Sequence, residues 1–300
     1  MNGCPGFVAA KSSARVRTSR TGRRSFCAAA AASVSSSGHF PPNAPPSGAA
    51  IALTRRCGSP SALATPLRVS NSDWVALSTT RAYVANQGSG TVSVIDLTQN
   101  PPVVVATIPV GSQPDALALR SDGARLDVAN YGGASVSVID TATNAVTRTV
   151  AVGSRPTGIL ELAGLVYVAN LSSHSVSFFD PGVAAPTASS FTVPATGATL
   201  SAPSGLAASP DAHTLYVNDA RNGKTFVFDL TQNPPASTGS VLNGAGSFPA
   251  YLAVAGSTGY SANPGTNSIR VLDLTALSAT NVPVGASPYG VVALDRKSVV

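Results

Sequence analysis

Short runs in which β-branched and aromatic residues alternate with polar ones recur along most of the chain, separated by Gly, Asn, Asp, Ser and Pro. Alternation with a period of two residues is typical of β-strands that are buried on one side. One unit, residues 83–96, reads YVANQGSGTVSVID and returns four more times in degraded form, at residues 128–140, 167–180, 216–229 and 260–273. The sequence therefore predicts an array of one copied β-unit.

The spacing of these copies indicates the architecture. Each copy ends on an aspartate, and successive closing aspartates are separated by 44, 40, 49 and 44 residues, a period typical of repeat folds. In the second repeat, strands are expected at residues 115–119, 125–129, 135–139 and 145–152, with the turn-forming sequences SDG, NYGG and DTATN between them. Four antiparallel strands in about forty residues is the size of a propeller blade. The closing aspartates are Asp96, Asp140, Asp180, Asp229 and Asp273.

Other landmarks recur in register with the strands. A G-x-x-P motif precedes the first strand in four places, and DLTQNPP is repeated without change at residues 96–102 and 229–235. The first strands are rich in Gly and Ala, as expected where strands converge on an axis with little lateral room. We therefore expect an all-β β-propeller of four-stranded antiparallel blades, with five complete blades and the first strand of a sixth at residues 289–294. The G-x-x-P motifs begin at Gly111, Gly153, Gly246 and Gly285.

The two ends of the chain differ from the repeats. Residues 1–70 hold nine basic and no acidic side chains, lack strand or helix periodicity, and are predicted to be disordered. Within them, RRSF at residues 23–26 and the small residues that follow resemble a twin-arginine export signal, with a low-complexity Ala/Arg tail as the alternative. The propeller is expected to cover residues 71–294. Residues 295–300, DRKSVV, match the translation of a common sequencing adapter, so we expect an artefact there and a parent chain of six or seven blades.

Charge and cysteine content narrow the function classes. After residue 70 the chain has ten basic and thirteen acidic residues, a net charge of about −3, so a nucleic-acid partner is not expected. The cysteines Cys4, Cys27 and Cys57 all precede residue 70, which excludes a disulfide or a thiolate metal cluster from the repeats. No apolar run is long enough for an ordinary transmembrane helix. No phosphate-binding glycine loop, nucleophile elbow or CxxC cluster is present, so no cofactor and no catalytic residue is assigned.

The recurring motifs carry a family resemblance. With YVAN and SVID in alternation, G-x-x-P before the first strands, and SPD or SDG turns, residues 71–294 resemble the YVTN family of bacterial and archaeal β-propellers. The resemblance implies an exported protein, secreted, periplasmic or on the cell surface. It also implies kinship with the propellers of surface-layer proteins, lactonases and subunits of redox enzymes. Such a resemblance identifies a scaffold and not a reaction.

The binding surface is expected at one end of the blades. In a four-stranded blade, the G-x-x-P loop and the loop after YVAN lie at the same end, and loops on a shared scaffold are where propellers form binding sites. We call this end the channel face. Its predicted binding residues are Gln113, Asp115, Arg155, Phe248 and Tyr289 around the channel, and Gln87, Tyr131, His174 and Arg221 further out.

Candidates for catalysis are few. His174 and His213 are the only histidines after residue 70, and they are expected on opposite faces, so a two-histidine metal site is not predicted. The closing aspartates lie in different blades and are expected to cap turns. Glu161 is the only glutamate and would suit acid–base chemistry if it were buried and paired.

Two functions follow from these observations. The first is a non-catalytic exported propeller that serves as a binding or surface-scaffold module, with a small molecule or a protein on the channel face. The alternative is a lactonase-like hydrolase or a propeller subunit of a redox enzyme. The two functions differ in whether charged side chains meet in one pocket. A pocket shared by Glu161, Asp115 and Arg155 would favour an enzyme.

Overall fold

Five β-sheets make up the body of the molecule. The computed structural model describes residues 31–35, 48–52, 75–291 and 293. Between Val75 and Pro283 the strands form five four-stranded antiparallel sheets, each with its strands in chain order from one edge to the other. The prediction of five complete blades is confirmed.

The strands of each blade follow one another along the chain. Blade 1 comprises β3 (Val75–Leu77), β4 (Arg81–Asn86), β5 (Thr91–Asp96) and β6 (Val103–Pro109). Blade 2 comprises β7 (Pro114–Leu119), β8 (Arg125–Asn130), β9 (Ser135–Asp140) and β10 (Ala145–Ala151). Blade 3 comprises β11 (Pro156–Leu162), β12 (Leu165–Asn170), β13 (Ser175–Phe179) and β14 (Ser189–Thr192). Blade 4 comprises β15 (Pro203–Ala208), β16 (Thr214–Asp219), β17 (Lys224–Asp229) and β18 (Ala236–Leu242). Blade 5 comprises β19 (Leu252–Ala255), β20 (Thr258–Asn263), the 3-10 turn η1 (Pro264–Thr266), β21 (Ser268–Asp273) and β22 (Ser278–Pro283).

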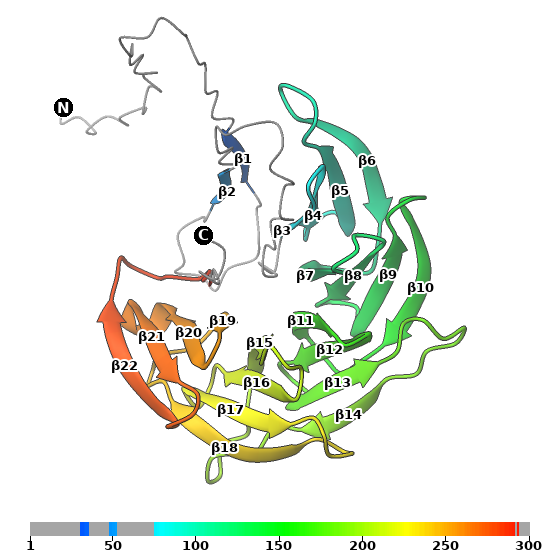
Figure 1. Cartoon of the computed structure of the whole chain (residues 1–300). Helices are drawn as coiled ribbons and strands as arrows, with labels where there is room; N and C mark the ends of the chain where they lie inside the picture. The colour runs from blue at the N-terminus through cyan, green and yellow to red at the C-terminus, as the bar shows by residue number, and fades with distance from the viewer. Residues whose placement is uncertain (1–30, 36–47, 53–74, 292, 294–300) are drawn as a thin grey trace, which may run out of the picture.

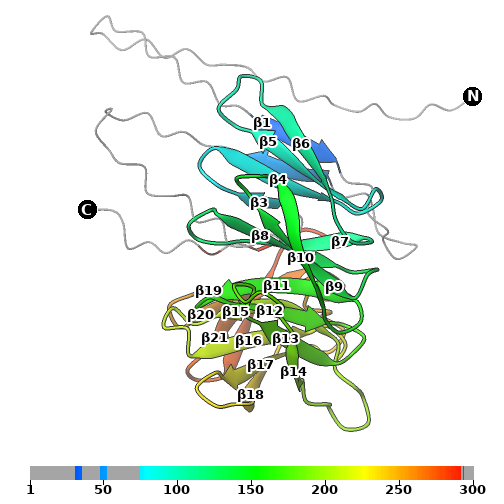
Figure 2. The same cartoon turned by 90° about the vertical axis from the view of Figure 1, so that its right-hand side faces the viewer.

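The blades stand around an arc, with the first strand of each on the inside and the fourth on the outside (Figure 1). Turned by a quarter, the successive sheets are stacked on one another from blade 1 onward (Figure 2). Neighbouring inner strands touch, from β3 through β7, β11 and β15 to β19. This close approach explains the small residues, because a side chain on Gly158 would run into the carbonyl oxygen of Ser204, and one on Gly205 would lie 2.5 Å from that of Ala250.

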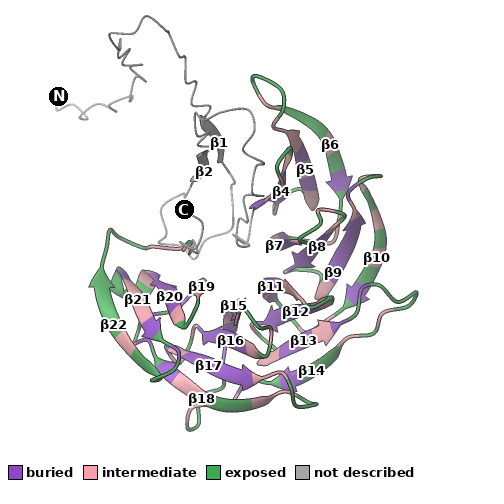
Figure 3. Ribbon diagram, in the orientation of Figure 1, coloured by how far each residue is buried: buried purple, intermediate pink, exposed green. Residues whose placement is uncertain are grey.

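Buried residues concentrate on the inner strands, while the outermost strands are largely exposed (Figure 3). The hydrophobic core lies between the blades. The second and third strands turn apolar side chains to both neighbours, and each seam between two blades is filled by one cluster. At the seam of blades 3 and 4, for example, Phe191 and Phe228 pack with their ring centroids 4.9 Å apart. The second strands are buried on both faces because successive residues in them, such as Tyr83, Val84 and Ala85, are apolar, so the burial on one side that alternation predicts does not hold there.

The closing aspartates cap turns, as predicted. The carboxylate of Asp96 accepts the N–H of Thr98 at 2.8 Å, and that of Asp140 accepts the N–H of Ala142 at 2.8 Å. The asparagines that end YVAN do not cap turns in this way. The amide of Asn170 instead donates to the hydroxyls of Ser175 and Ser177 on the third strand, because it is buried inside the blade.

Three predictions concern the ends of the chain. The strand expected at residues 289–294 is not formed in its described part, 289–291 and 293, because the described residues contain no second strand of a sixth blade to complete a ladder. Within residues 1–70, β1 (Ala31–Ser35) and β2 (Gly48–Ala52) form an antiparallel pair, which the composition did not predict. The RRSF motif and residues 295–300 lie outside the described residues. Among the described residues, no helix has the length and apolar character needed to cross a membrane.

Candidate functional site

The channel face is formed as expected. The N–H of Tyr131 donates to the carbonyl oxygen of Gln113 at 2.9 Å, and the N–H of Leu171 donates to that of Arg155 at 3.0 Å. In blades 2 and 3, therefore, the loop after the second strand is hydrogen-bonded to the G-x-x-P loop of the same blade. The two loops form one continuous edge.

The G-x-x-P loops share an uncommon backbone conformation. The residue before the proline is left-handed in all four motifs, with φ values of 52° at Gln113, 53° at Arg155, 47° at Phe248 and 50° at Ser287. Residues other than glycine rarely adopt this conformation, which costs about 1–3 kcal/mol. Phe248 is 56% exposed. One backbone shape thus presents a different side chain ahead of blades 2, 3 and 5 and again after blade 5.

Side chains of the channel face meet across the seams between blades. The Nε2 atom of Gln87 in blade 1 donates to the Asp115 carboxylate in blade 2 at 3.2 Å. The guanidinium of Arg155, ahead of blade 3, lies 5.7 Å from the ring centroid of Tyr131 in blade 2, a cation–π contact. Both pairs join the loop after one blade's second strand to the start of the next blade.

Three other nominated residues contact backbone carbonyl oxygens or a neighbouring aromatic ring. The Nδ1 atom of His174 lies 2.5 Å from the carbonyl oxygen of Ser201, again across a seam. The Nη1 atom of Arg221 donates to the carbonyl oxygen of Leu200 at 3.4 Å. The ring of Tyr289 lies 6.2 Å from that of Tyr251. The structure therefore joins four of the nominated residues in two pairs, Gln87 with Asp115 and Arg155 with Tyr131, whereas the others contact residues that were not nominated.

Glu161 does not join this face. It lies near the far end of β11, six residues after Arg155, which at about 3.3 Å per strand residue is a separation of roughly 20 Å. Its carboxylate accepts the N–H of Gly164 at 3.2 Å in the turn that follows. The pocket of Glu161, Asp115 and Arg155 that would have favoured an enzyme is not formed.

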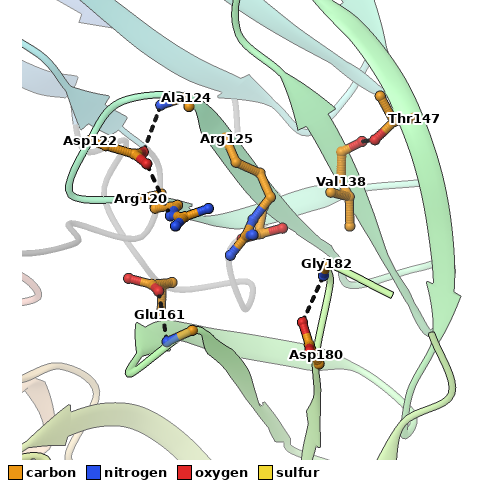
Figure 4. A network of polar contacts seen from close by, with 11 residues as sticks. Arg120, Asp122, Ala124, Arg125, Val138, Thr147, Glu161, Asp180 and Gly182 are labelled. Atoms are coloured by element: carbon orange, nitrogen blue, oxygen red, sulfur yellow. Dashed lines mark hydrogen bonds and ion pairs between the residues drawn. The ribbon is translucent and has the colours of Figure 1, made fainter. Parts of the chain in front are cut away.

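At the end of the blades opposite the channel face, charged groups converge between blades 2 and 3 (Figure 4). The Nε atom of Arg125 lies 3.1 Å from the Oδ2 atom of Asp127, whose side chain is completely buried. Arg120 and Asp122, in the turn before β8, form a second ion pair at 3.2 Å that is half exposed. Glu161 lies across the seam from them (Figure 4).

Asp127 has the most perturbed environment of this group. Burial raises the pKa of its carboxyl to about 6, the attraction and hydrogen bond of Arg125 oppose this rise, and the negative charge of Glu161 adds to it. The Oδ1 atom of Asp127 and the Nη2 atom of Arg125 are buried without a hydrogen-bond partner among the described residues. A buried ion pair that is incompletely satisfied costs stability, so its presence needs an explanation.

Asp127 was not among the residues predicted from the sequence, although its repeat position carries a signal. The equivalent residue is a tyrosine in the other four repeats, Tyr83, Tyr167, Tyr216 and Tyr260. A carboxylate at a position otherwise occupied by an aromatic residue is the departure that marks the site. Among the described residues, no group of three or more His, Cys, Asp or Glu side chains is arranged to hold a metal ion.

Solved structures with the same arrangement of strands support this description. The periplasmic gluconolactonase of Pseudomonas aeruginosa aligns with a TM-score of 0.62 at 18% identity, over 72% of this chain and 71% of that one. A putative 6-phosphogluconolactonase of Bacteroides fragilis aligns with a TM-score of 0.60 at 16% identity, over 71% and 70%. The chain has the β-propeller fold. A streptogramin B lyase aligns with a TM-score of 0.60 at 12% identity, over 73% and 71%, so proteins with different names share this propeller.

The sequence comparisons add no family. No family model matches the chain, and no curated protein matches it. Lactonase-like propellers are thus among its structural neighbours, while the resemblance to the YVTN family stays a prediction.

Proposed function

We propose that this propeller is a ligand-binding module that captures a small polar molecule on its channel face. The observation that carries the proposal is the left-handed residue repeated before the proline in each G-x-x-P loop. Each loop accepts a strained backbone and uses it to present a side chain of its own, among them Gln113, Arg155 and Phe248. Strained backbone of this kind clusters at ligand-binding sites.

Export forms part of this proposal. The motif RRSF at residues 23–26 resembles a twin-arginine signal, and one protein of the same fold is described as periplasmic. A small polar molecule outside the cytoplasm, or a protein that displays one, is the proposed partner.

Lactone hydrolysis is the second candidate function. Two solved propellers of this fold are described as putative 6-phosphogluconolactonases and a third as a gluconolactonase. On the channel face, Asp115 carries a carboxylate at the second residue of the inner strand β7. The equivalent residues of blades 3 and 4, Thr157 and Ser204, carry hydroxyls instead. Such a carboxylate could accept a proton from an attacking water molecule.

One experiment separates the two functions. The purified chain is titrated with D-gluconate, followed by ligand-observed NMR, and is mixed with D-glucono-1,5-lactone while released acid is recorded in a pH-stat. Binding that weakens at least tenfold in Arg155→Ala, with no acid release above the uncatalysed rate, supports the binding module. Acid release that is lost in Asp115→Asn supports the hydrolase. Asp211→Asn, at the opposite end of blade 4, is the control and should match the wild type in both assays. If the wild type neither binds gluconate nor hydrolyses the lactone, both proposed functions are refuted for these two compounds.

A further inference from the structure

Asp127 occupies a position that faces the next blade. In the other repeats this position belongs to the cluster between its own blade and the next one, as Tyr83, Tyr167 and Tyr216 show. In blade 2 the strand neighbours of Asp127 are Ala118 and Val138, and both belong to the apolar cluster between blades 2 and 3. The carboxyl group therefore lies within the seam, and any change in its charge acts on the contact of two blades.

The groups around Asp127 come from three elements. Arg125 lies two residues earlier on β8, Arg120 lies in the turn before β8, and Glu161 belongs to β11 of blade 3. Arg125 and Arg120 favour the charged form of Asp127, while Glu161 and burial favour the protonated form. Because burial is the largest of these effects, the carboxyl titrates in the mildly acidic range with a pKa of about 6.

The guanidinium of Arg125 has two possible carboxylate partners. It is bound to Asp127 through Nε, while Nη2 has no partner among the described residues. It extends from β8 toward the side of the seam on which Glu161 lies (Figure 4). Asp127 belongs to the same strand as Arg125, whereas Glu161 belongs to the next blade, so a change of partner would replace a contact within blade 2 by a contact between blades.

We propose that Asp127 and Arg125 form a proton-operated switch at the seam of blades 2 and 3, in which protonation of Asp127 releases Arg125 to pair with Glu161. A proton taken up from solvent on the Asp127 carboxyl removes one negative charge, and no other bond is formed or broken. The guanidinium stays charged throughout. Glu161, which faces the seam from β11 of blade 3, is the carboxylate that the released arginine then binds, and this contact links the two blades. This switch is independent of the function proposed for the channel face, because it lies at the other end of the blades.

Carboxyl titration by NMR tests the proposal on the full chain. The protein is labelled with ¹³C at aspartate carboxyls and with ¹⁵N in arginine side chains, and the Asp127 signal is assigned by its absence in Asp127→Asn. We expect the Asp127 carboxyl and the Arg125 side chain to shift together with one midpoint near pH 6. In Glu161→Gln the carboxyl midpoint should fall, because a negative charge that raised it is gone, and the Arg125 shift should become smaller because its second partner is lost.

One control variant and a second route to the signal assignment keep the test decisive. Asp211→Asn removes an exposed carboxyl from the equivalent turn of blade 4 and should leave the Asp127 midpoint unchanged. If Asp127→Asn does not fold, the signal can be assigned from Glu161→Gln alone, as the one aspartate whose midpoint moves. An Asp127 midpoint near the ordinary value of 3.8, or an Arg125 signal that does not follow it, would overturn the switch.

Discussion

The glycine that opens the G-x-x-P motif of blade 3 allows a sharp test of how this loop is packed. Gly153 lies against Asn170, which is completely buried at the end of β12. A Cβ atom on Gly153 would lie 2.5 Å from the Cγ atom of Asn170 and 2.7 Å from its Cβ and Nδ2 atoms. These distances are too short for unbonded atoms, so Gly153→Ala must displace the asparagine.

The cost follows from what the asparagine holds. Its amide donates to Ser175 at 3.2 Å and to Ser177 at 2.8 Å, and each lost hydrogen bond costs about 0.5–1.5 kcal/mol. Overpacking a buried site costs about 1–3 kcal/mol in addition. Because relaxation lowers both contributions, we expect Gly153→Ala to reduce the free energy of unfolding by about 2–4 kcal/mol.

The matched control is Gly88→Ala, in the loop after β4. A Cβ atom there would have nothing within 4 Å, and its backbone φ lies outside the left-handed range. Both variants remove the same freedom from the unfolded chain, an effect of about 0.4–1 kcal/mol that cancels in the comparison. Urea unfolding followed by circular dichroism gives both values. Free energies of unfolding that agree within about 0.5 kcal/mol would refute the packing argument.

Three further outcomes are expected. The raised pKa of Asp127 means that the folded state holds this proton more tightly than the unfolded state. The contribution of Asp127 to stability is therefore greatest below pH 3.8 and falls as the pH rises through about 6, by about 3 kcal/mol in total. Unfolding free energies of Asp127→Asn measured from pH 4 to 8 should lack this decline, and an unchanged slope would contradict the prediction. The hydroxyl and N–H of Thr231 lower the pKa of Asp229, so this carboxylate stabilises the fold above pH 3.8 and loses that effect as the pH falls through its pKa in the folded state. The titration midpoint of the Asp229 carboxyl, measured by NMR, should lie below 3.8 in the wild type and rise in Thr231→Val. Arg155→Ala removes the cation–π contact with Tyr131 and should cost about 0.5–1 kcal/mol of stability, so a loss of several kcal/mol in denaturant unfolding would show a structural role in place of a binding one.

Local chemistry made most of the fold predictable. The alternation of apolar and polar residues placed the four strands of blade 2 within one or two residues of their observed bounds, because strand faces have a period of two. The fixed spacing of Asp96, Asp140 and the later aspartates gave the number of blades, and their role as turn caps needed only the next few residues. The end of the blades at which the G-x-x-P loops lie followed from the alternating direction of the strands.

Contacts between blades could not be read from the sequence. Glu161, Asp115 and Arg155 were considered together because two of them belong to inner strands and Arg155 lies in the loop before one. A strand of seven residues nevertheless separates its two ends by about 20 Å, and this separation decided against a shared pocket. Asp127 and Glu161 are 34 positions apart and lie in different blades, so only the stacking of blade 2 on blade 3 brings their charges together. The sequence by itself determined the strands, the turns and the blade order, since these depend on neighbouring residues. The tertiary structure alone decided which carboxyl is buried and what faces it, because burial and charge pairing depend on side chains that the chain brings together only when it folds.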